Sequence, residues 1–406
     1  MTLLDLLPSL HRTAKEHIDP AVWPLTASVD ESGRLCVGQV ALTDIADEFG
    51  TPAYVIDEAD VRHRIRRHRN VLSNAEIAYA GESLLTTGIA RWAAEEHIGI
   101  DVRSADELAL ALAGGIDPKR IILHGSGISI DDLHAAVAAG VGRIVVGSPT
   151  EIAHLASEAH RPQLLLVRVT PDVNLTADET VKRILDAPEL NLVGLHCHIG
   201  EQVTNADTYA DVIRRMIAAM ADIRAHHGVR LIELNIGGGQ GVRYINGDAE
   251  LDLAELSDLI EDALDGACAA ERFPRPRIVV EPGRAISARA GVTLARVLAT
   301  TTQPGGPTLV VVDGGVSDNQ HAQRSGAKYT VALANRNPMG PTQLATVASQ
   351  HCESGDEVAR HVELPADTRP GDLLAIARTG AEHSDNMVGR PPLIAVHRGK
   401  ATELAS

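Results

Sequence analysis

Residues 75–125 read AEIAYAGESLLTTGIARWAAEEHIGIDVRSADELALALAGGIDPKRIILHG, and this stretch decides the fold. It holds three short runs with strand character, EIAYA (76–80), GIDVR (99–103) and IILHG (121–125), and apolar residues recur at helical spacing between them. The same alternation continues, with further strand-like runs at 143–147, 164–169, 192–198, 231–237 and 277–281. Eight strands that are each followed by a helix predict a (β/α)8 barrel, whose active site lies at the carboxyl ends of the strands.

After about residue 288 the pattern changes to alternating strand-like runs without long helices, with proline and glycine between them. The segment LCVGQVALTD at 35–44 has the same character and is expected to join this second part. We therefore predict a barrel domain over 42–288 that carries the site. Residues 1–41 and 289–406 are expected to form a β-barrel or sandwich domain, so that the barrel is an insertion.

Composition excludes several classes of protein. The chain has 54 acidic and 37 basic residues, a formal net charge of -17, and no clustering of lysine and arginine on one face, which disfavours a nucleic-acid-binding surface. Its four cysteines form no CxxC pair, so neither a disulfide framework nor a zinc ribbon is indicated. No run of about 18 apolar residues and no secretion signal occurs. We expect a cytoplasmic protein that does not bind membranes.

Polar residues stand where the predicted strands end, as the active site of a barrel requires. They are Glu82, Arg103, His124, Arg168, His198, Gly237, Gly238, Gly239 and Glu281. The run NIGGGQG (235–241) can turn backbone N–H groups toward an anion, with an ordinary tight turn as the alternative. EPGR (281–284) follows the eighth strand, and the loops after strands seven and eight form the usual phosphate site of barrels.

The EPGR motif suggests a division of roles. Glu281 would hold a protonated ring nitrogen, while the amides of Gly283 and Arg284 would complete an anion cup; surface salt bridges are the alternative. LHCHIG (195–200) places His196 and His198 on one face of a strand. The lack of a third ligand at metal-binding spacing favours stacking or hydrogen bonding by His198, with a metal as a further alternative.

Several motifs resemble, in order and spacing, those of the diaminopimelate decarboxylases. They are FGTPAYVID, the YAG before Glu82, HCHIG, GGGQG, EPGR, VDGGVSDN, HCESGD, LPADTRPGDLL and TGA. The resemblance implies a pyridoxal phosphate (PLP) enzyme of fold type III, which has an alanine-racemase-like (β/α)8 barrel and a C-terminal β domain. It also implies a lyase of amino-acid metabolism, with an amino-acid-like ligand and homodimer contacts in the β domain.

The resemblance also assigns residues. Arg168 would meet the phenolic oxygen of PLP, His198 would stack on its ring, and Glu281 would pair with its pyridine nitrogen. The phosphate cup would be made by Gly237, Gly238, Gly239, Gly283 and Arg284. Cys352 and Glu353 of HCESGD match residues that the family supplies across the dimer interface, the cysteine as a proton donor and the glutamate as a substrate contact. From the residues alone, a buried structural cysteine is the alternative for Cys352.

The departures from the family pattern concentrate at this site. Family members read YAxKA after the first strand, with a lysine that forms the Schiff base, but this chain has Glu82 there. Glu201 replaces a phosphate-binding serine, and Glu382 replaces a phosphate-binding tyrosine. In the substrate segment next to Asp318, His321 replaces the carboxylate-binding arginine. A carboxylate beside a phosphate repels it, so PLP binding in the ordinary way is expected to be impaired.

Three functions are compatible with these residues. The first is a repurposed enzyme in which Glu82, His198, Glu201, Cys352 and Glu382 form an acidic pocket for a cationic amino-acid derivative or a metal, with a carboxylate as general acid or base. The second is a non-catalytic relative that pairs with an active decarboxylase, as a heterodimer, or regulates it. The third is a PLP-dependent decarboxylase with atypical cofactor binding.

Overall fold

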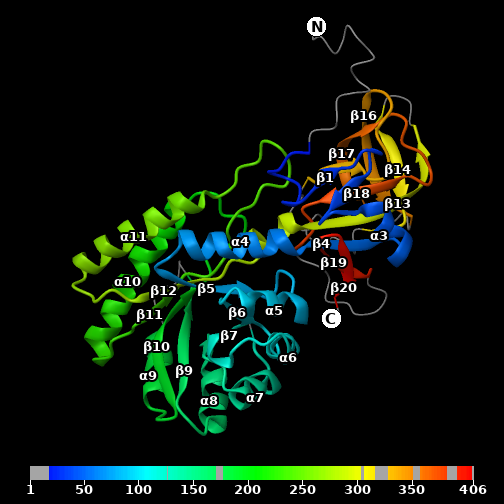
Figure 1. Ribbon diagram of the computed structural model, residues 1–406. Coiled ribbons are helices and arrows are strands. Elements are labelled where there is room, and N and C mark those ends of the chain that lie inside the picture. Colours follow the sequence, from blue (N-terminus) through cyan, green and yellow to red (C-terminus); the bar gives the residue numbers. More distant parts are fainter. Residues whose placement is uncertain are drawn as a thin grey trace. The chain divides into compact units, whose positions relative to one another are not determined.

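The computed structural model describes residues 18–125, 127–170, 177–302, 306–315, 328–350, 357–381 and 391–404 (Figure 1). The chain divides into two compact units. One comprises residues 62–242 and 249–286, and the other comprises residues up to 61 together with 243–248 and 287–405. Within the described residues, no helix has the length and apolar character needed to cross a membrane.

The first unit contains the predicted barrel. In the described part of the chain, eight parallel strands close on themselves in the order β10-β11-β12-β5-β6-β7-β8-β9. Their bounds are β5 (Ala75–Ala80), β6 (Gly99–Val102), β7 (Ile121–Leu123), β8 (Arg143–Val146), β9 (Gln163–Val169), β10 (Leu190–Cys197), β11 (Glu233–Asn235) and β12 (Arg277–Val280). Each lies within two residues of a predicted run, so the strand assignment and the fold class are confirmed.

Helices α4 to α11 alternate with the strands, as Figure 1 shows from blue (α4) to yellow-green (α11). They are α4 (Glu58–Val71), α5 (Thr87–Glu95), α6 (Ala105–Ala113), α7 (Ile130–Ala139), α8 (Pro149–Glu158), α9 (Ala177–Leu185), α10 (Asp207–His227) and α11 (Leu253–Ala270), with the 3-10 turn η1 (Pro118–Arg120) before β7. Residues in the sequence fix where several of these helices start. Ser129 and Ser148 are the N-cap residues of α7 and α8 and form capping boxes, and Asp252 is the N-cap residue of α11.

Apolar side chains fill the barrel. Its central cluster takes one residue from each of six strands: Ala78, Ile122, Val145, Leu166, Val193 and Val279. All six are buried, as the layered interior of such a barrel requires. Because this apolar cluster fills the interior of the barrel, we expect a ligand of this unit to bind at the strand ends and the loops that follow them.

The second unit is built mainly of β-strands. Its larger sheet has the order β17-β16-β14-β13-β4-β19-β20, with β18 paired to β13 and β15 paired to β18. The strands are β4 (Ala53–Asp57), β13 (Gly291–Thr301), β14 (Thr308–Val312), β15 (Val331–Leu333), β16 (Thr342–Ser349), β17 (Glu357–Pro365), β18 (Leu373–Ala377), β19 (Leu393–His397) and β20 (Lys400–Glu403). The short elements α12 (Arg284–Ser287) and η2 (Ala288–Ala290) precede β13.

The segment around residues 35–44 joins this unit, but only partly as strand. β1 (Ser28–Val29), β2 (Leu35–Val37) and β3 (Val40–Ala41) form a small sheet, and the chain then enters α3 (Leu42–Phe49). The side chains of Leu42 and Ile45 pack in the same apolar core as those of Val292 and Leu373. β4 pairs with β13 and β19. The barrel unit therefore begins at residue 62, which differs from the predicted start at 42, because α3 and β4 bury their apolar side chains in the β unit.

Candidate active site

Six polar residues come together at the carboxyl ends of the barrel strands. Asp101 lies on β6, Arg168 on β9, His196 on β10 and Asn235 on β11, while His124 and Glu281 directly follow β7 and β12. Since all the strands are parallel, their carboxyl ends meet at the same mouth of the barrel. Residues far apart in sequence are thereby brought together.

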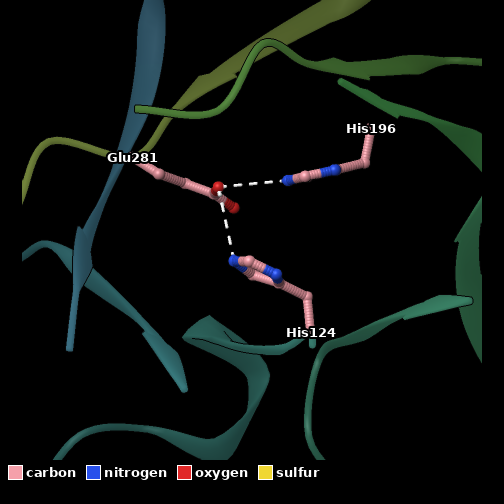
Figure 2. Close-up of side chains that lie close together, drawn as sticks. All are labelled: His124, His196 and Glu281. Atoms are coloured by element: carbon pink, nitrogen blue, oxygen red, sulfur yellow. Dashed lines mark hydrogen bonds and ion pairs between the residues drawn. The ribbon is translucent and has the colours of Figure 1, made fainter. Parts of the chain in front are cut away.

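Glu281 is the centre of this group. Figure 2 shows the imidazoles of His196 and His124 pointing toward its carboxylate. Its Oε2 lies 3.2 Å from His196 Nε2 and 3.9 Å from His124 Nε2, and its Oε1 accepts a hydrogen bond of 2.6 Å from the Asn235 amide. Glu281 is only 3% exposed and His196 is fully buried. A buried carboxylate is stable only with such partners.

Asp101 extends the network. Its Oδ2 lies 2.7 Å from His124 Nε2, and the two imidazole rings of His124 and His196 are 5.0 Å apart at their centroids. Asp101 is 2% exposed, and its Oδ1 has no hydrogen-bond partner. The floor of the barrel mouth therefore combines two buried carboxylates with two imidazoles.

The pKa values follow from this packing. Burial opposes ionisation of Glu281, but His196, His124 and Asn235 outweigh it and lower the pKa of Glu281 to about 2. Burial lowers the pKa of His124 by itself, yet the carboxylates of Asp101 and Glu281 raise this pKa to about 9. Burial also raises the pKa of Asp101 to about 7, against the opposing effect of His124. Glu281 is thus an anion at neutral pH, and the Asp101–His124 pair retains a proton.

His196 and His198 differ in environment, although the sequence placed them on one face. His196 is the last but one residue of β10 and is fully buried, while His198 lies just beyond the strand and is half-buried. Burial and the charge of Arg168 lower the pKa of His198, and burial lowers the pKa of His196. His196, and not His198, is the histidine that joins Glu281.

The glycines of the loop after β11 are needed because the surrounding backbone leaves no room for a Cβ atom. A Cβ on Gly238 would lie 2.1 Å from the carbonyl oxygen of Glu281, and one on Gly239 would lie 1.9 Å from that of Gly200. Gly237 and Gly239 also have positive φ values of 67° and 81°. The loop therefore packs directly against the loops after β10 and β12.

The two described carboxylates that depart from the family pattern are each paired with an arginine. Glu82, after β5, has its Oε2 3.2 Å from Nη1 of Arg103, and its side chain is 48% exposed. Glu201, after β10, has its Oε2 3.0 Å from Nη2 of Arg284, and its side chain is 70% exposed. The charges of these two acids of the predicted pocket are therefore partly neutralised.

The lysines of the barrel unit lie away from this mouth. Lys119 is in η1, before β7 begins, and its Nζ donates to the carbonyl of Gly140 at 3.0 Å. Lys182 is on α9, in the outer layer of helices. Lys119 and Lys182 are the two lysines among the described residues of the barrel unit.

Asp318, His321, Cys352, Glu353 and Glu382 lie outside the described residues. The candidates that are described lie at strand ends of the barrel unit or in the loops that follow them, except Arg284, which begins α12.

Sequence reasoning missed Asp101 and Asn235, and it did not group His124 with His196 and Glu281. Asp101 and Asn235 are polar residues inside otherwise apolar strands, and this was the available signal. A second concave region was also missed, a cavity of about 540 Å³ at the amino-terminal ends of the strands. There Arg143 binds Glu76 and the buried Glu233, which is a structural ion pair in a barrel face associated with stability.

Comparison with known proteins identifies the family. Residues 58–183 and 173–288 match the model of the pyridoxal-dependent decarboxylase, pyridoxal binding domain. The diaminopimelate decarboxylase of Actinosynnema pretiosum subsp. auranticum is 42% identical over 431 residues, covering 100% of this chain and 97% of that protein. The chain belongs to the diaminopimelate decarboxylase family.

Two further members show the extent of the likeness. The diaminopimelate decarboxylase of Mycobacterium bovis is 38% identical over 424 residues, with 95% of each chain covered. The structure of the diaminopimelate decarboxylase of M. jannaschii in complex with L-lysine superposes with a TM-score of 0.85 at 23% identity, covering 93% of this chain and 94% of that one. The fold is thus shared along nearly the whole chain. The family is PLP-dependent, and its members are lyases.

Proposed function

We propose that this chain is a divergent member of the diaminopimelate decarboxylase family, in which an acidic site replaces the PLP–lysine centre. It is proposed to act as an enzyme on a small cationic molecule derived from an amino acid. The observation that carries the proposal is Glu82, which stands where the family resemblance requires the Schiff-base lysine and is held by Arg103 at 3.2 Å. A carboxylate cannot form an imine, so the defining covalent step of the family has no residue here.

The positions of the lysines support the loss of the covalent centre. Lys119 precedes β7 and is bonded to a carbonyl, so its amine lies at the end of the barrel opposite to Glu281. Lys182 sits on α9, which is part of the outer layer. Neither amine can replace the missing one without a rearrangement of the barrel.

The pairing of Arg284 supports the loss of the phosphate site. The resemblance assigns Arg284 to the phosphate cup, but its guanidinium is bonded to the carboxylate of Glu201. A phosphate with a charge of about -1.5 to -2 must compete with that carboxylate and then remain beside it. The residues present therefore do not fit PLP bound through a lysine, and no catalytic step is assigned to that cofactor.

The groups that remain define the proposed chemistry. Carboxyl groups slightly outnumber cations around the mouth, with Asp101, Glu82, Glu107, Glu201 and Glu281 against Arg103, Arg168, Arg284 and His124, whose pKa is raised to about 9. This balance favours a ligand with an amino group, and a structural relative in the family was solved with L-lysine. Glu82 and His198 are partly exposed, so they are the described groups best placed to exchange protons with a bound molecule.

The test is to add PLP to the purified chain, remove the excess, and record the absorption spectrum in the near-ultraviolet and violet. The proposal expects no stoichiometric chromophore. A bound chromophore at one equivalent per chain would contradict it and would favour an atypical PLP-dependent decarboxylase. Purification of the chain as a stable complex with a complete decarboxylase, without turnover of its own, would favour a non-catalytic partner instead.

The variant Glu82→Lys extends the test. Restoring the amine alone is expected to give no stable imine, because Glu201 still holds Arg284. The double variant Glu82→Lys with Glu201→Ser is expected to bind PLP more tightly than either single variant. Decarboxylase activity in Glu82→Lys alone would show that the phosphate cup is intact and that only the lysine was lost.

A further inference from the structure

We propose that His124, His196 and Glu281 bind a divalent transition-metal ion, of the class of Zn²⁺, at the floor of the barrel mouth. The inference deepens the proposed function and rests on it, because a PLP ring held by Glu281 would occupy the same carboxylate. It starts from three side chains that come from the ends of three different strands and point toward one another (Figure 2).

The distances suit a metal ion. One donor atom from each of the three residues lies within 4.8 Å of the other two. Glu281 Oε2 is 3.2 Å from His196 Nε2 and 3.9 Å from His124 Nε2. A cation between these atoms would lie roughly 2–2.5 Å from each, which is close to the Zn–N and Zn–O bond lengths of about 2.0–2.2 Å. Binding of the ion by His124 Nε2 would also require this nitrogen to give up its 2.7 Å hydrogen bond with Asp101 Oδ2.

The ligand types select the class of ion. Two imidazoles and one carboxylate form the same donor set as the His₂Glu sites of catalytic zinc enzymes, in which a fourth position is left for water or substrate. Imidazole suits zinc, copper, iron and nickel, whereas magnesium and calcium prefer oxygen ligands throughout. The cluster is also nearly dry: Glu281 is 3% exposed and His196 is fully buried. A cation there would be shielded from competing water.

Two polar neighbours, Asn235 and Asp101, adjoin the proposed ligands. The Asn235 amide donates to Glu281 Oε1, which leaves Oε2 directed at the two histidines. Asp101 Oδ2 lies 2.7 Å from His124 Nε2, which places a second carboxyl group beside the proposed ion. The other oxygen of Asp101 and the Nδ1 atoms of His124 and His196 are buried without a hydrogen-bond partner.

A metal at this position would change what the barrel mouth can do. It would lie at the carboxyl ends of the strands, where substrates bind in barrels, and it would serve as a Lewis acid for a carboxylate or carbonyl of an amino-acid-derived ligand. The partly exposed Glu82 and His198 would then act as proton-transferring groups beside it. The metal ion would then be the electrophile of the site, in a chain that has no lysine to form a Schiff base.

The experiment measures metal content and a spectrum, independently of turnover. The full-length chain is stripped with a chelator, incubated with Zn²⁺, freed of excess metal and analysed by mass spectrometry for zinc per chain. Parallel samples with Co²⁺ are examined for the visible absorption of low-coordinate cobalt. We expect one Zn²⁺ per chain and a cobalt spectrum from the unmodified protein.

Three variants and one control decide the location. Glu281→Gln keeps the shape of the side chain, and it is compared with His124→Asn and His196→Asn. Each is expected to weaken zinc binding at least about a hundredfold, since loss of even an indirect partner costs about 10- to 100-fold. The control is His68→Asn, which removes another buried histidine of the barrel unit, one bonded to Arg64 and Gln240. It is expected to retain zinc and the cobalt spectrum.

Two results would overturn the inference: no retained zinc in the unmodified protein, or equal retention in Glu281→Gln and in the unmodified protein. Failure of the metal site is distinguishable from failure of the proposed function. If neither zinc nor a PLP chromophore is bound, only the metal inference fails. If PLP forms a stoichiometric chromophore, the proposed function fails as well.

Discussion

Substitution of Glu201 by glutamine should tighten the binding of phosphate-bearing ligands at the barrel mouth. In the unmodified chain, Oε2 of Glu201 lies 3.0 Å from Nη2 of Arg284, a guanidinium that is only 12% exposed. A phosphate that binds Arg284 must displace this carboxylate and then remain about 5 Å from it. Glutamine keeps the size of the side chain and removes the charge.

The expected magnitude follows from Coulomb's law. Glu201 is 70% exposed, so the dielectric constant of water applies, and a unit charge about 5 Å away costs about 0.8 kcal/mol. For a phosphate of about -1.5 to -2, the repulsion is about 1.5 kcal/mol, or roughly a tenfold change in Kd. The effect should shrink as salt is added, because the Debye length is about 8 Å at 0.15 M and about 3 Å at 1 M.

Isothermal titration calorimetry with pyridoxine 5′-phosphate measures this effect. That ligand carries the ring and the phosphate but no aldehyde, so it cannot form imines with other lysines. The matched control is Glu179→Gln on α9, where an exposed glutamate also pairs with an arginine, Arg183, at 2.7 Å. An unchanged Kd in Glu201→Gln, or equal tightening in both variants, would refute the reasoning.

Two further predictions concern stability. Burial lowers the pKa of His68 to about 4 in the folded chain, against 6.5 for an exposed histidine. The unfolded chain therefore binds more protons between these values, so stability is lost as the pH falls from 6.5 to 4, by about 3 kcal/mol in total. Denaturant unfolding of His68→Gln at several pH values should show a flatter dependence, while the exposed His160→Gln should resemble the unmodified protein. Gly239→Ala should lower Tm more than Gly228→Ala in a thermal scan, because both positions have positive φ but only Gly239 would place its Cβ 1.9 Å from a carbonyl oxygen; equal shifts in Tm would contradict this account.

Much of the barrel could be predicted because its signal is local. Runs such as RIVV before a capped helix at Ser148 carry both the strand and the start of the next helix in their own residues. The boundary at the N-terminal side was less accurate. Helix α3 and strand β4 precede the barrel directly, and only their packing against Val292 and Leu294 assigns them to the β unit. This contact joins residues that are far apart in the sequence, so a local sequence pattern does not predict it.

The candidate site was predictable in position but not in arrangement. The glycine loop, Glu281 and Arg284 were identified from motifs, and they do lie at strand ends of the barrel. The partners of the acids were not identified, because Glu201 and Arg284 are separated by 83 residues and Glu82 and Arg103 by 21. The two described acids of the pocket expected from the sequence, Glu82 and Glu201, are each paired with an arginine in the structure.

By itself, the sequence determined the number and order of the barrel strands, the family, and the presence of Glu82 where a Schiff-base lysine was expected. Periodicity and motif order suffice for these, since they depend on neighbouring residues. Only the tertiary structure decided that His196 turns toward Glu281, 85 residues away, and that His124 and Asp101 complete the group. Closure of the barrel brings strand ends together that are distant in the chain, and such contacts are set by packing in three dimensions and not by local pattern.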